Sequence, residues 1–140
     1  MLVELADTSA WASRGRSSAV GAEFDRLLEA RSIVTCAMVR LELLWSTRDA
    51  RHFTSIRADL EALREAPMGN RVWRRATDVF HQLAERGPLH HRQVGLHDLL
   101  IAAAAELAEL PVLHYDRDFE LIADVTRQPV RALAPLGSLE

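Results

Sequence analysis

The chain has 140 residues, of which 49% are hydrophobic and 26% charged, and its formal net charge is -3. This length suits one globular domain over residues 1–140, and the composition excludes both a disordered chain and a strongly basic protein that coats nucleic acid. All 17 basic residues are arginines, so P-loop nucleoside triphosphatases and enzymes with a Schiff-base lysine are also excluded.

The first half of the chain alternates predicted strands with predicted helices. Short apolar runs predict the strands, and apolar residues at helical spacing predict the helices. In chain order we expect a strand at 2–6, a polar loop at 14–18, a helix at 19–30, a strand at 32–35 and a helix at 37–46. Asp49 is the expected N-cap of a further helix, whose apolar stripe reaches Leu63.

The second half continues the same alternation after a break at residues 67–70. Its longest predicted helix starts at Asn70 and stops at Gly87 and Pro88, which are poor helix formers. There follow an expected helix within 95–109, a strand at 111–115, a short helical turn at 119–123 and an edge strand at 129–133. Short apolar strands separated by helices predict an α/β fold, with a parallel sheet covered on both faces.

The sequence contains no sign of export or membrane insertion. Cys36 is the only cysteine and cannot form an intrachain disulfide, and the acidic N-terminus differs from a signal peptide. The uncharged stretch at 99–105 is far shorter than the ~20 apolar residues that span a bilayer. We therefore expect a cytoplasmic protein that does not cross a membrane.

Four acidic residues interrupt otherwise apolar elements. Asp7 and Asp116 each follow a predicted strand, Glu42 lies beside the apolar stripe of its helix, and Asp98 shares a stripe with Ile101. Taken singly, each has a structural explanation: a turn residue, a loop acid, a solvated helix edge or a favourable charge at a helix start. Taken together, they predict a cation site, because a buried carboxylate is costly unless it is paired or binds a metal.

Ligands of open parallel sheets gather beyond the carboxyl ends of the strands, where Asp7 and Asp116 are expected. Carboxylates crowded there would repel one another and raise their pKa values unless a cation compensates. Mg²⁺ prefers oxygen ligands and typically binds through a few carboxylates together with substrate phosphates. The pattern therefore favours a Mg²⁺-dependent enzyme that acts on a phosphate ester.

Four motifs resemble those of one known family. In order and spacing, the chain is similar to PIN domains, specifically to VapC-type toxins of bacterial type II toxin-antitoxin systems, over essentially its whole length. The motifs are Asp7-Thr8-Ser9-Ala10-Trp11, Arg40-Leu41-Glu42-Leu43, His97-Asp98-Leu99-Leu100-Ile101-Ala102-Ala103 and Tyr115-Asp116-Arg117-Asp118-Phe119.

The resemblance implies a PIN-like three-layer fold, with a central parallel sheet of four or five strands between helices. It implies Mg²⁺ or Mn²⁺ bound mainly by Asp7 and Asp98, with Glu42 and Asp116 completing the catalytic site. Asp118 is common in these toxins and is expected to share in the metal site. The resemblance also implies an endoribonuclease that forms a homodimer and is inhibited by a VapB-type antitoxin.

The mechanism that we expect is in-line attack on RNA by a metal-activated water, which expels the 3′ oxygen. Arg14, Arg16 and Arg117 flank the acids in sequence and are candidate phosphate contacts. The sequence does not distinguish tRNA, rRNA and mRNA as the substrate. A groove for an antitoxin helix is expected among Trp45, Phe53, Ile56 and Leu60.

His114, the other histidines and the function itself each allow a second interpretation. His114 stands where many relatives have Thr or Ser; it either donates a hydrogen bond or only fills the sheet edge. His90, His91 and His97 fit no common zinc spacing and are interpreted as loop and helix-start residues. The alternative functions are a catalytically inactive PIN-like module that binds RNA or a partner, and another Mg²⁺-dependent phosphohydrolase, although Ser9 and the absence of lysine disfavour the latter.

Overall fold

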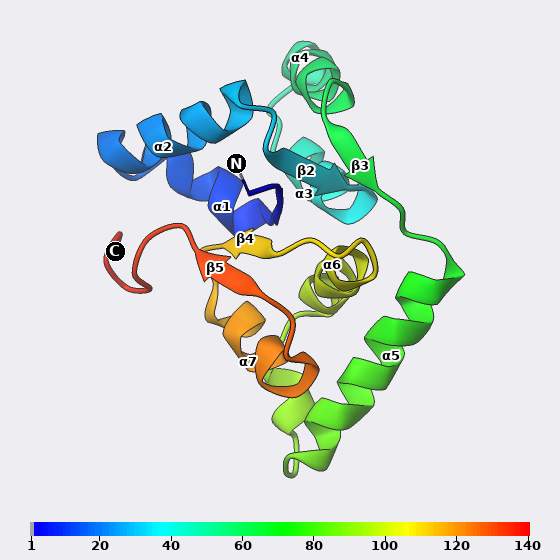
Figure 1. Ribbon diagram of the computed structural model, residues 1–140. Coiled ribbons are helices and arrows are strands. Elements are labelled where there is room, and N and C mark those ends of the chain that lie inside the picture. Colours follow the sequence, from blue (N-terminus) through cyan, green and yellow to red (C-terminus); the bar gives the residue numbers. More distant parts are fainter. Residues whose placement is uncertain (1) are drawn as a thin grey trace.

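The computed structural model describes residues 2–140, and these form a five-stranded parallel sheet with helices on both sides (Figure 1). The strand order is β3-β2-β1-β4-β5. The strands are β1 (Glu4–Ala6), β2 (Ile33–Cys36), β3 (Arg64–Ala66), β4 (Val112–His114) and β5 (Val130–Ala132). The predicted α/β class and parallel sheet are therefore confirmed.

The helices fill the connections between the strands. The described α-helices are α1 (Thr8–Ala12), α2 (Ser18–Glu29), α3 (Ala37–Trp45), α4 (Ala50–Glu61), α5 (Asn70–Glu85), α6 (Leu96–Leu107) and α7 (Arg117–Thr126). Short 3-10 turns occur at Ser13–Gly15 and His90–Gln93. Along residues 2–140, no helix has both the length and the apolar character needed to cross a membrane.

The central position of β1 determines where a ligand can bind. Leu5 of β1 pairs with Val34 of β2 on one side and with Val112 of β4 on the other. The chain therefore builds outward from β1 to β2 and β3, and then crosses back to add β4 and β5 on the opposite side. Such a reversal separates the connections that follow β1 and β4, and it creates a crevice beyond their carboxyl ends.

Two apolar clusters join the layers. On the side of α1 and α2, Phe24 and Leu27 pack with Ile33 and Leu113 from the sheet (Figure 1). On the side of α5 and α6, the larger cluster includes almost every residue of α6 from Leu99 to Ala105. The alanine-rich composition of α6 follows from this burial, because small side chains let the helix lie close to both the sheet and α5.

The structure differs from the sequence-based elements at the weakest signals. Strand β3 was not predicted, since Arg64 and Glu65 are exposed on an edge strand and carry no apolar alternation. The helix expected to reach Leu63 ends at Glu61, just before this strand. The expected turn after Asp7 is a short helix, and the expected helical turn at 119–123 is part of the longer α7.

One buried acid of the sheet is neutralised within the protein. Glu4 of β1 is fully buried, and both of its carboxylate oxygens accept hydrogen bonds from Arg131 of β5, at 2.9 Å from Nε and 2.6 Å from Nη2. This fork-to-fork contact raises the pKa of Arg131. The pair ties the central strand to a partly exposed edge strand, across β4.

We expect Arg131→Met to lower the free energy of unfolding by about 2–3 kcal/mol, because Glu4 would keep its burial without a counter-charge. The matched control is Arg57→Met, since Arg57 pairs with Glu61 on the solvent face of α4 and should contribute under about 0.5 kcal/mol. Urea denaturation followed by circular dichroism measures both. Equal losses in the two variants would show that the buried pair contributes no more to stability than a surface ion pair does.

Candidate active site

Three helix starts bring acids to the crevice beyond β1 and β4. Asp7 follows β1 as the N-cap of α1, and Asp116 follows β4 as the N-cap of α7. Asp98 lies in the first turn of α6. Each position combines the end of a strand or loop with the start of a helix, where backbone N–H groups favour a carboxylate.

Asp7 is held in place by its own turn. Its Oδ2 atom accepts hydrogen bonds from the backbone N–H of Ser9 at 2.9 Å and from the Ser9 hydroxyl at 2.6 Å. The Ser9 oxygen in turn accepts the backbone N–H of Tyr115 at 2.8 Å. Ser9 thus joins the ends of β1 and β4, a role that the sequence did not predict.

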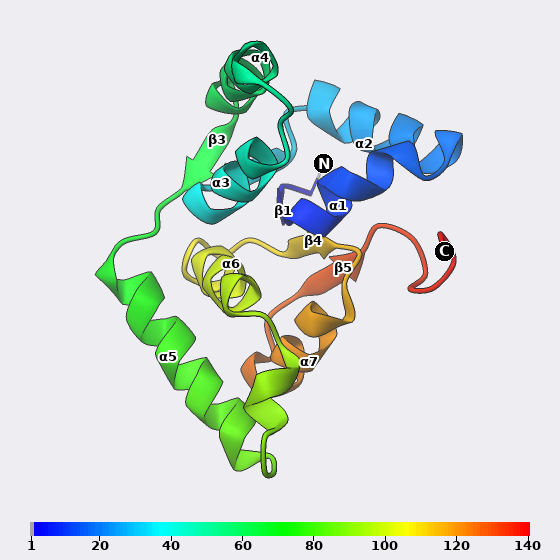
Figure 2. The same cartoon turned by 180° about the vertical axis from the view of Figure 1, so that it is seen from behind.

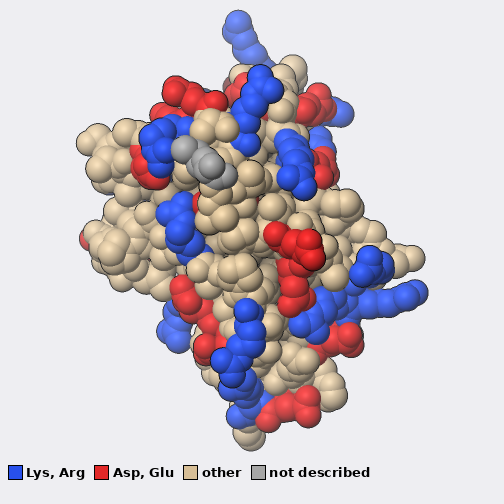
Figure 3. All heavy atoms as spheres, in the orientation of Figure 1, with Lys and Arg blue, Asp and Glu red and all other residues tan. Residues whose placement is uncertain are grey.

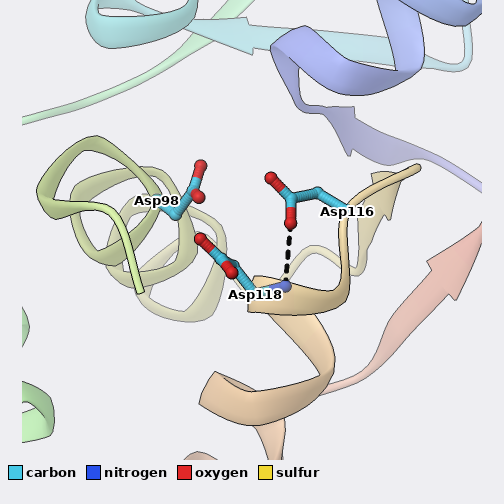
Figure 4. Close-up of side chains that lie close together, drawn as sticks. All are labelled: Asp98, Asp116 and Asp118. Carbon is cyan, nitrogen blue, oxygen red and sulfur yellow. Dashed lines mark hydrogen bonds between the residues drawn. The ribbon is translucent and has the colours of Figure 1, made fainter. Parts of the chain in front are cut away.

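Asp98, Asp116 and Asp118 form the tightest acidic group. Each offers a carboxylate oxygen within 4.8 Å of the others, and their side chains point toward a common space (Figure 4). Asp116 Oδ1 accepts the backbone N–H of Asp118 at 2.9 Å, and Asp118 Oδ2 accepts the N–H of Gly95 at 3.1 Å. These two bonds fix the start of α7 against the start of α6. From the sequence, Asp118 was expected only to share in the metal site beside the four principal acids.

Glu42 reaches the site from α3. The hydroxyl of Thr8 donates to Glu42 Oε1 at 2.9 Å, and Thr8 directly follows Asp7. His97 Nε2 lies 3.7 Å from Glu42 Oε2 and 3.4 Å from Asp98 Oδ1. Helices α1, α3 and α6, which carry these residues, lie side by side (Figure 2). His97 is therefore a member of the site, although its spacing to other histidines had suggested only a helix-start residue.

Burial, together with nearby negative charge, raises the pKa values of Asp98 and Asp7. Asp98 is 2% exposed, and burial is the main reason why its pKa rises from the ordinary 3.8 to about 9. A hydrogen bond between its protonated form and Asp118, and repulsion by the nearby acids, add to the effect. Burial also raises the pKa of Asp7, with a smaller contribution from Glu42. The protein alone thus supplies too little positive charge for these carboxylates.

These observations test whether a metal ion fits the residues present. Asp7 Oδ1 and Asp98 Oδ2 are buried and have no hydrogen-bond partner among residues 2–140. A buried acceptor without a partner is unfavourable, and a bound cation is a partner that such an oxygen can take. Because all of the donors are carboxylate oxygens, the set suits a hard divalent ion rather than zinc or copper. The site can therefore bind a metal ion.

His114 has a structural position beside the site. It is fully buried at the end of β4, and its Nδ1 accepts the backbone N–H of Asp116 at 3.1 Å. Its Nε2 lies 3.2 Å from Glu120 without the alignment of a hydrogen bond, and burial lowers its pKa. Neutral His114 therefore fills the sheet edge and helps to position Asp116.

The three candidate phosphate contacts differ in their availability. Arg14 pairs with Asp25 and lies over the rings of Trp11 and Phe24. Arg16 lies over the ring of Tyr115 and within 3.7 Å of Glu140. Arg117 is exposed and forms no ion pair within the described part of the chain. Of the three, Arg117 has the side chain that is free to reach a substrate.

A hollow lies close to where the sequence predicted an apolar groove, but its lining differs from the prediction. A hollow of about 350 Å³ lies between α1 and the pair α3 and α4, and Leu43, Ile56 and Leu60 line it together with Trp11. Of the four predicted residues, Trp45 and Phe53 do not line this groove. Trp45 lines a second hollow, which also includes Glu42.

Charge on the face shown in Figure 3 is interspersed, with arginine and acidic side chains side by side rather than in one large patch of either sign. This agrees with the small net charge of -3. The face in this view therefore offers no broad basic surface for nonspecific binding of a polyanion.

Comparison with known proteins gives a consistent result. The sequence profile of the PIN domain matches residues 5–125. Ribonuclease VapC18 of Mycobacterium tuberculosis is 38% identical over 99% of this chain and 100% of its own, and Ribonuclease VapC21 of the same species is 39% identical over 96% of each.

Solved structures share the fold at lower identity. The DNA-bound VapBC structure from Salmonella typhimurium matches with a TM-score of 0.73 and 18% identity, over 96% of this chain and 100% of that one. VapBC-5 from Mycobacterium tuberculosis matches with a TM-score of 0.58 and 24% identity, over 94% and 98%. With an acidic crevice at the sheet switch point, a matching profile and full-length relatives, this chain belongs to the PIN domain family.

Proposed function

We propose that this protein is a Mg²⁺-dependent endoribonuclease, and that it is the toxin of a VapBC-type toxin-antitoxin system. The observation that carries the proposal is the acidic crevice, in which two buried aspartates lack enough positive charge. The full-length relatives are named ribonucleases of the VapC family, which supports the same chemistry. We further propose that residues 1–140 form one PIN domain.

Mg²⁺ is the proposed cofactor, and Mn²⁺ is its natural substitute. Both ions coordinate carboxylate oxygens, and they bind substrate phosphates through the coordination positions that the protein leaves open. Asp98, Asp116 and Asp118 would hold the ion, with Asp7 at the same crevice and Glu42 at its edge. When bound, a divalent ion neutralises the phosphate under attack and makes a water more acidic.

The residues of the chain supply the positioning. Asp7, fixed by Ser9, and Asp98, fixed by its place in α6, keep two carboxylates in the crevice without rearrangement. Glu42 is held by Thr8 through one oxygen, and its second oxygen, 3.7 Å from His97 Nε2, would accept a proton from the attacking water. In-line attack on the phosphorus would break its bond to the 3′ oxygen, which takes up a proton from water, leaving a 5′-phosphate and a 3′-hydroxyl.

We expect Asp7→Asn and Asp98→Asn each to lower the rate of Mg²⁺-dependent RNA cleavage by at least about 100-fold, because each removes a charge that the metal site needs. The measurement is cleavage of total bacterial RNA, followed by mapping and end analysis of the products. Asp78→Asn, on the exposed side of α5, is the matched control and should cleave normally.

The outcomes of this assay separate the alternatives. Equal cleavage by Asp7→Asn, Asp98→Asn and wild type would place the chemistry elsewhere. Cyclic phosphate ends would mean attack by the 2′-hydroxyl of the substrate. Metal binding and RNA binding without any cleavage would favour the inactive PIN-like module, and cleavage of phosphate monoesters alone would favour another phosphohydrolase.

The protein without metal should become less stable as the pH rises from about 5 to 9. In this range folded Asp98, whose pKa is about 9, keeps a proton that the unfolded chain, near 3.8, has lost. Because the folded state binds more protons, the free energy of unfolding falls by up to about 1.4 kcal/mol per pH unit. Thermal melting in a chelator measures this slope.

Two controls make the pH experiment specific. Asp98→Asn, which cannot ionise, should flatten the slope. Saturating Mg²⁺ should reverse it, because metal ligands must be deprotonated and the ion then favours the charged form. A slope that is unchanged in Asp98→Asn would mean that another group is responsible.

We propose that the partner is a VapB-type antitoxin, as the VapBC titles of the similar structures support, and that its apolar segment occupies the groove lined by Leu43, Ile56 and Leu60. Ile56→Asp should weaken antitoxin binding at least about 10-fold, because it places a charge in an apolar contact. Co-purification with the product of the neighbouring gene measures this, and Asp59→Asn is a milder control on the same groove.

The expected homodimer stays a prediction, which sedimentation of the purified toxin tests.

A further inference from the structure

We propose that Trp45 is a stacking platform for an unpaired RNA base next to the cleaved phosphate, and that it thereby helps to select the RNA. This inference rests on the proposed function and specifies its substrate as single-stranded at that position. It follows from the exposure of Trp45, from the hollow that it shares with the acidic site, and from the charge of the protein.

Trp45 is the most exposed large apolar side chain of residues 2–140, with 89% of its surface accessible. It ends α3, whose buried face is formed by Val39 and Leu44. The sequence had placed Trp45 on one stripe with Met38 and Leu41, but Leu41 is exposed as well. An indole left in water gains nothing from burial, so core packing does not explain Trp45.

The ring of Trp45 borders a hollow that reaches Glu42, at the edge of the acidic site. This hollow measures about 500 Å³, and its lining includes Thr8, Glu42, Met38, Leu41 and Trp45. Thr8 and Glu42 are hydrogen-bonded to each other, and Thr8 follows Asp7. Trp45 is three residues after Glu42, so the two side chains leave neighbouring positions on α3.

Because Glu42 and Thr8 belong to both places, an RNA strand whose phosphate is bound at the acids would carry a flanking nucleotide toward this hollow. Its base would have to leave any duplex, since an aromatic ring can stack only on an exposed base face. Glu42 and the Trp45 ring would therefore contact different parts of one strand. The acid would face the backbone near the cleaved bond, and the ring would face the adjacent base.

The charge of the protein makes such a contact more important. Many RNA-binding proteins derive most of their affinity from basic residues that neutralise phosphates. This chain has a net charge of -3 and concentrates acids at its site, so the backbone of RNA is weakly attracted or repelled there. Stacking does not depend on net charge and tolerates different bases, which makes it a suitable source of affinity for this protein.

The test is a cycle that combines a protein change with an RNA change. Once the cleaved bond has been mapped, short single-stranded RNAs carrying one abasic nucleotide at successive positions around it are compared with the intact RNA. Trp45→Ala should lower kcat/KM for intact RNA by about 5- to 150-fold. At one abasic position, Trp45→Ala and wild type should differ little, because the stacking partner is already absent.

Two matched variants support the assignment. Trp45→Phe should recover most of the activity, since a smaller ring still stacks. Trp73→Ala removes another exposed tryptophan, 56% accessible on α5, and should cleave as wild type does. Binding of the same RNAs to Asp98→Asn, with and without Trp45→Ala, gives a second readout by fluorescence anisotropy that does not require cleavage.

The outcomes distinguish this inference from the proposed function. Suppose that wild type cleaves RNA, and that Trp45→Ala lowers kcat/KM by the same factor for intact RNA and for every abasic RNA, or does not lower it at all. Trp45 is then not a stacking platform, while the proposed nuclease function is supported. If Trp45→Ala leaves cleavage unchanged but weakens antitoxin binding or self-association, the exposed ring belongs to a protein interface. If wild type does not cleave RNA, the proposed function fails, and the platform falls with it.

Discussion

The structure depends on keeping negative charges together at one edge of a parallel sheet. Strands β1 and β4 lie next to each other, and their ends deliver Asp7 and Asp116 to the same crevice. Burial and mutual repulsion make these carboxylates costly, and the raised pKa of Asp98 expresses that cost. The helix starts and the Ser9 bridge hold the acids in place despite the repulsion. A cation from outside is the missing charge, and the function proposed here follows from that need.

Glu4 is also a buried acid that needs a counter-charge, but the protein supplies that charge itself. It too is an acid in a buried strand, yet Arg131 neutralises it with a forked contact inside the protein. The difference lies in position: Glu4 precedes the end of β1 and faces the sheet interior near β5, whereas Asp7 follows β1 and faces the crevice. A buried acid therefore indicates a nearby cation, and only its surroundings decide whether that cation is an arginine or a metal ion.

Helix α3 connects the proposed activities. Glu42 stands between two hollows, one lined by Leu43 and the neighbouring helix α4, the other by Trp45. Both hollows share Glu42 and Thr8, so the partner proposed for the groove and the RNA proposed for Trp45 would contact the same acid. Because they meet at one side chain, a segment bound in the groove can compete with substrate without covering the whole face of the protein.

The sequence by itself determined the α/β class, four of the five strands and the acids to examine, because apolar periodicity and residue type are local properties. It missed β3, since Arg64-Glu65-Ala66 is a short polar edge strand that resembles a loop. Tertiary structure alone decided which acid meets which cation, that His97 lies between Glu42 and Asp98, and that Trp45 points into solvent. The reason is physical: spacing along a helix shows that a face is apolar, but only the packing of distant segments shows whether that face is covered.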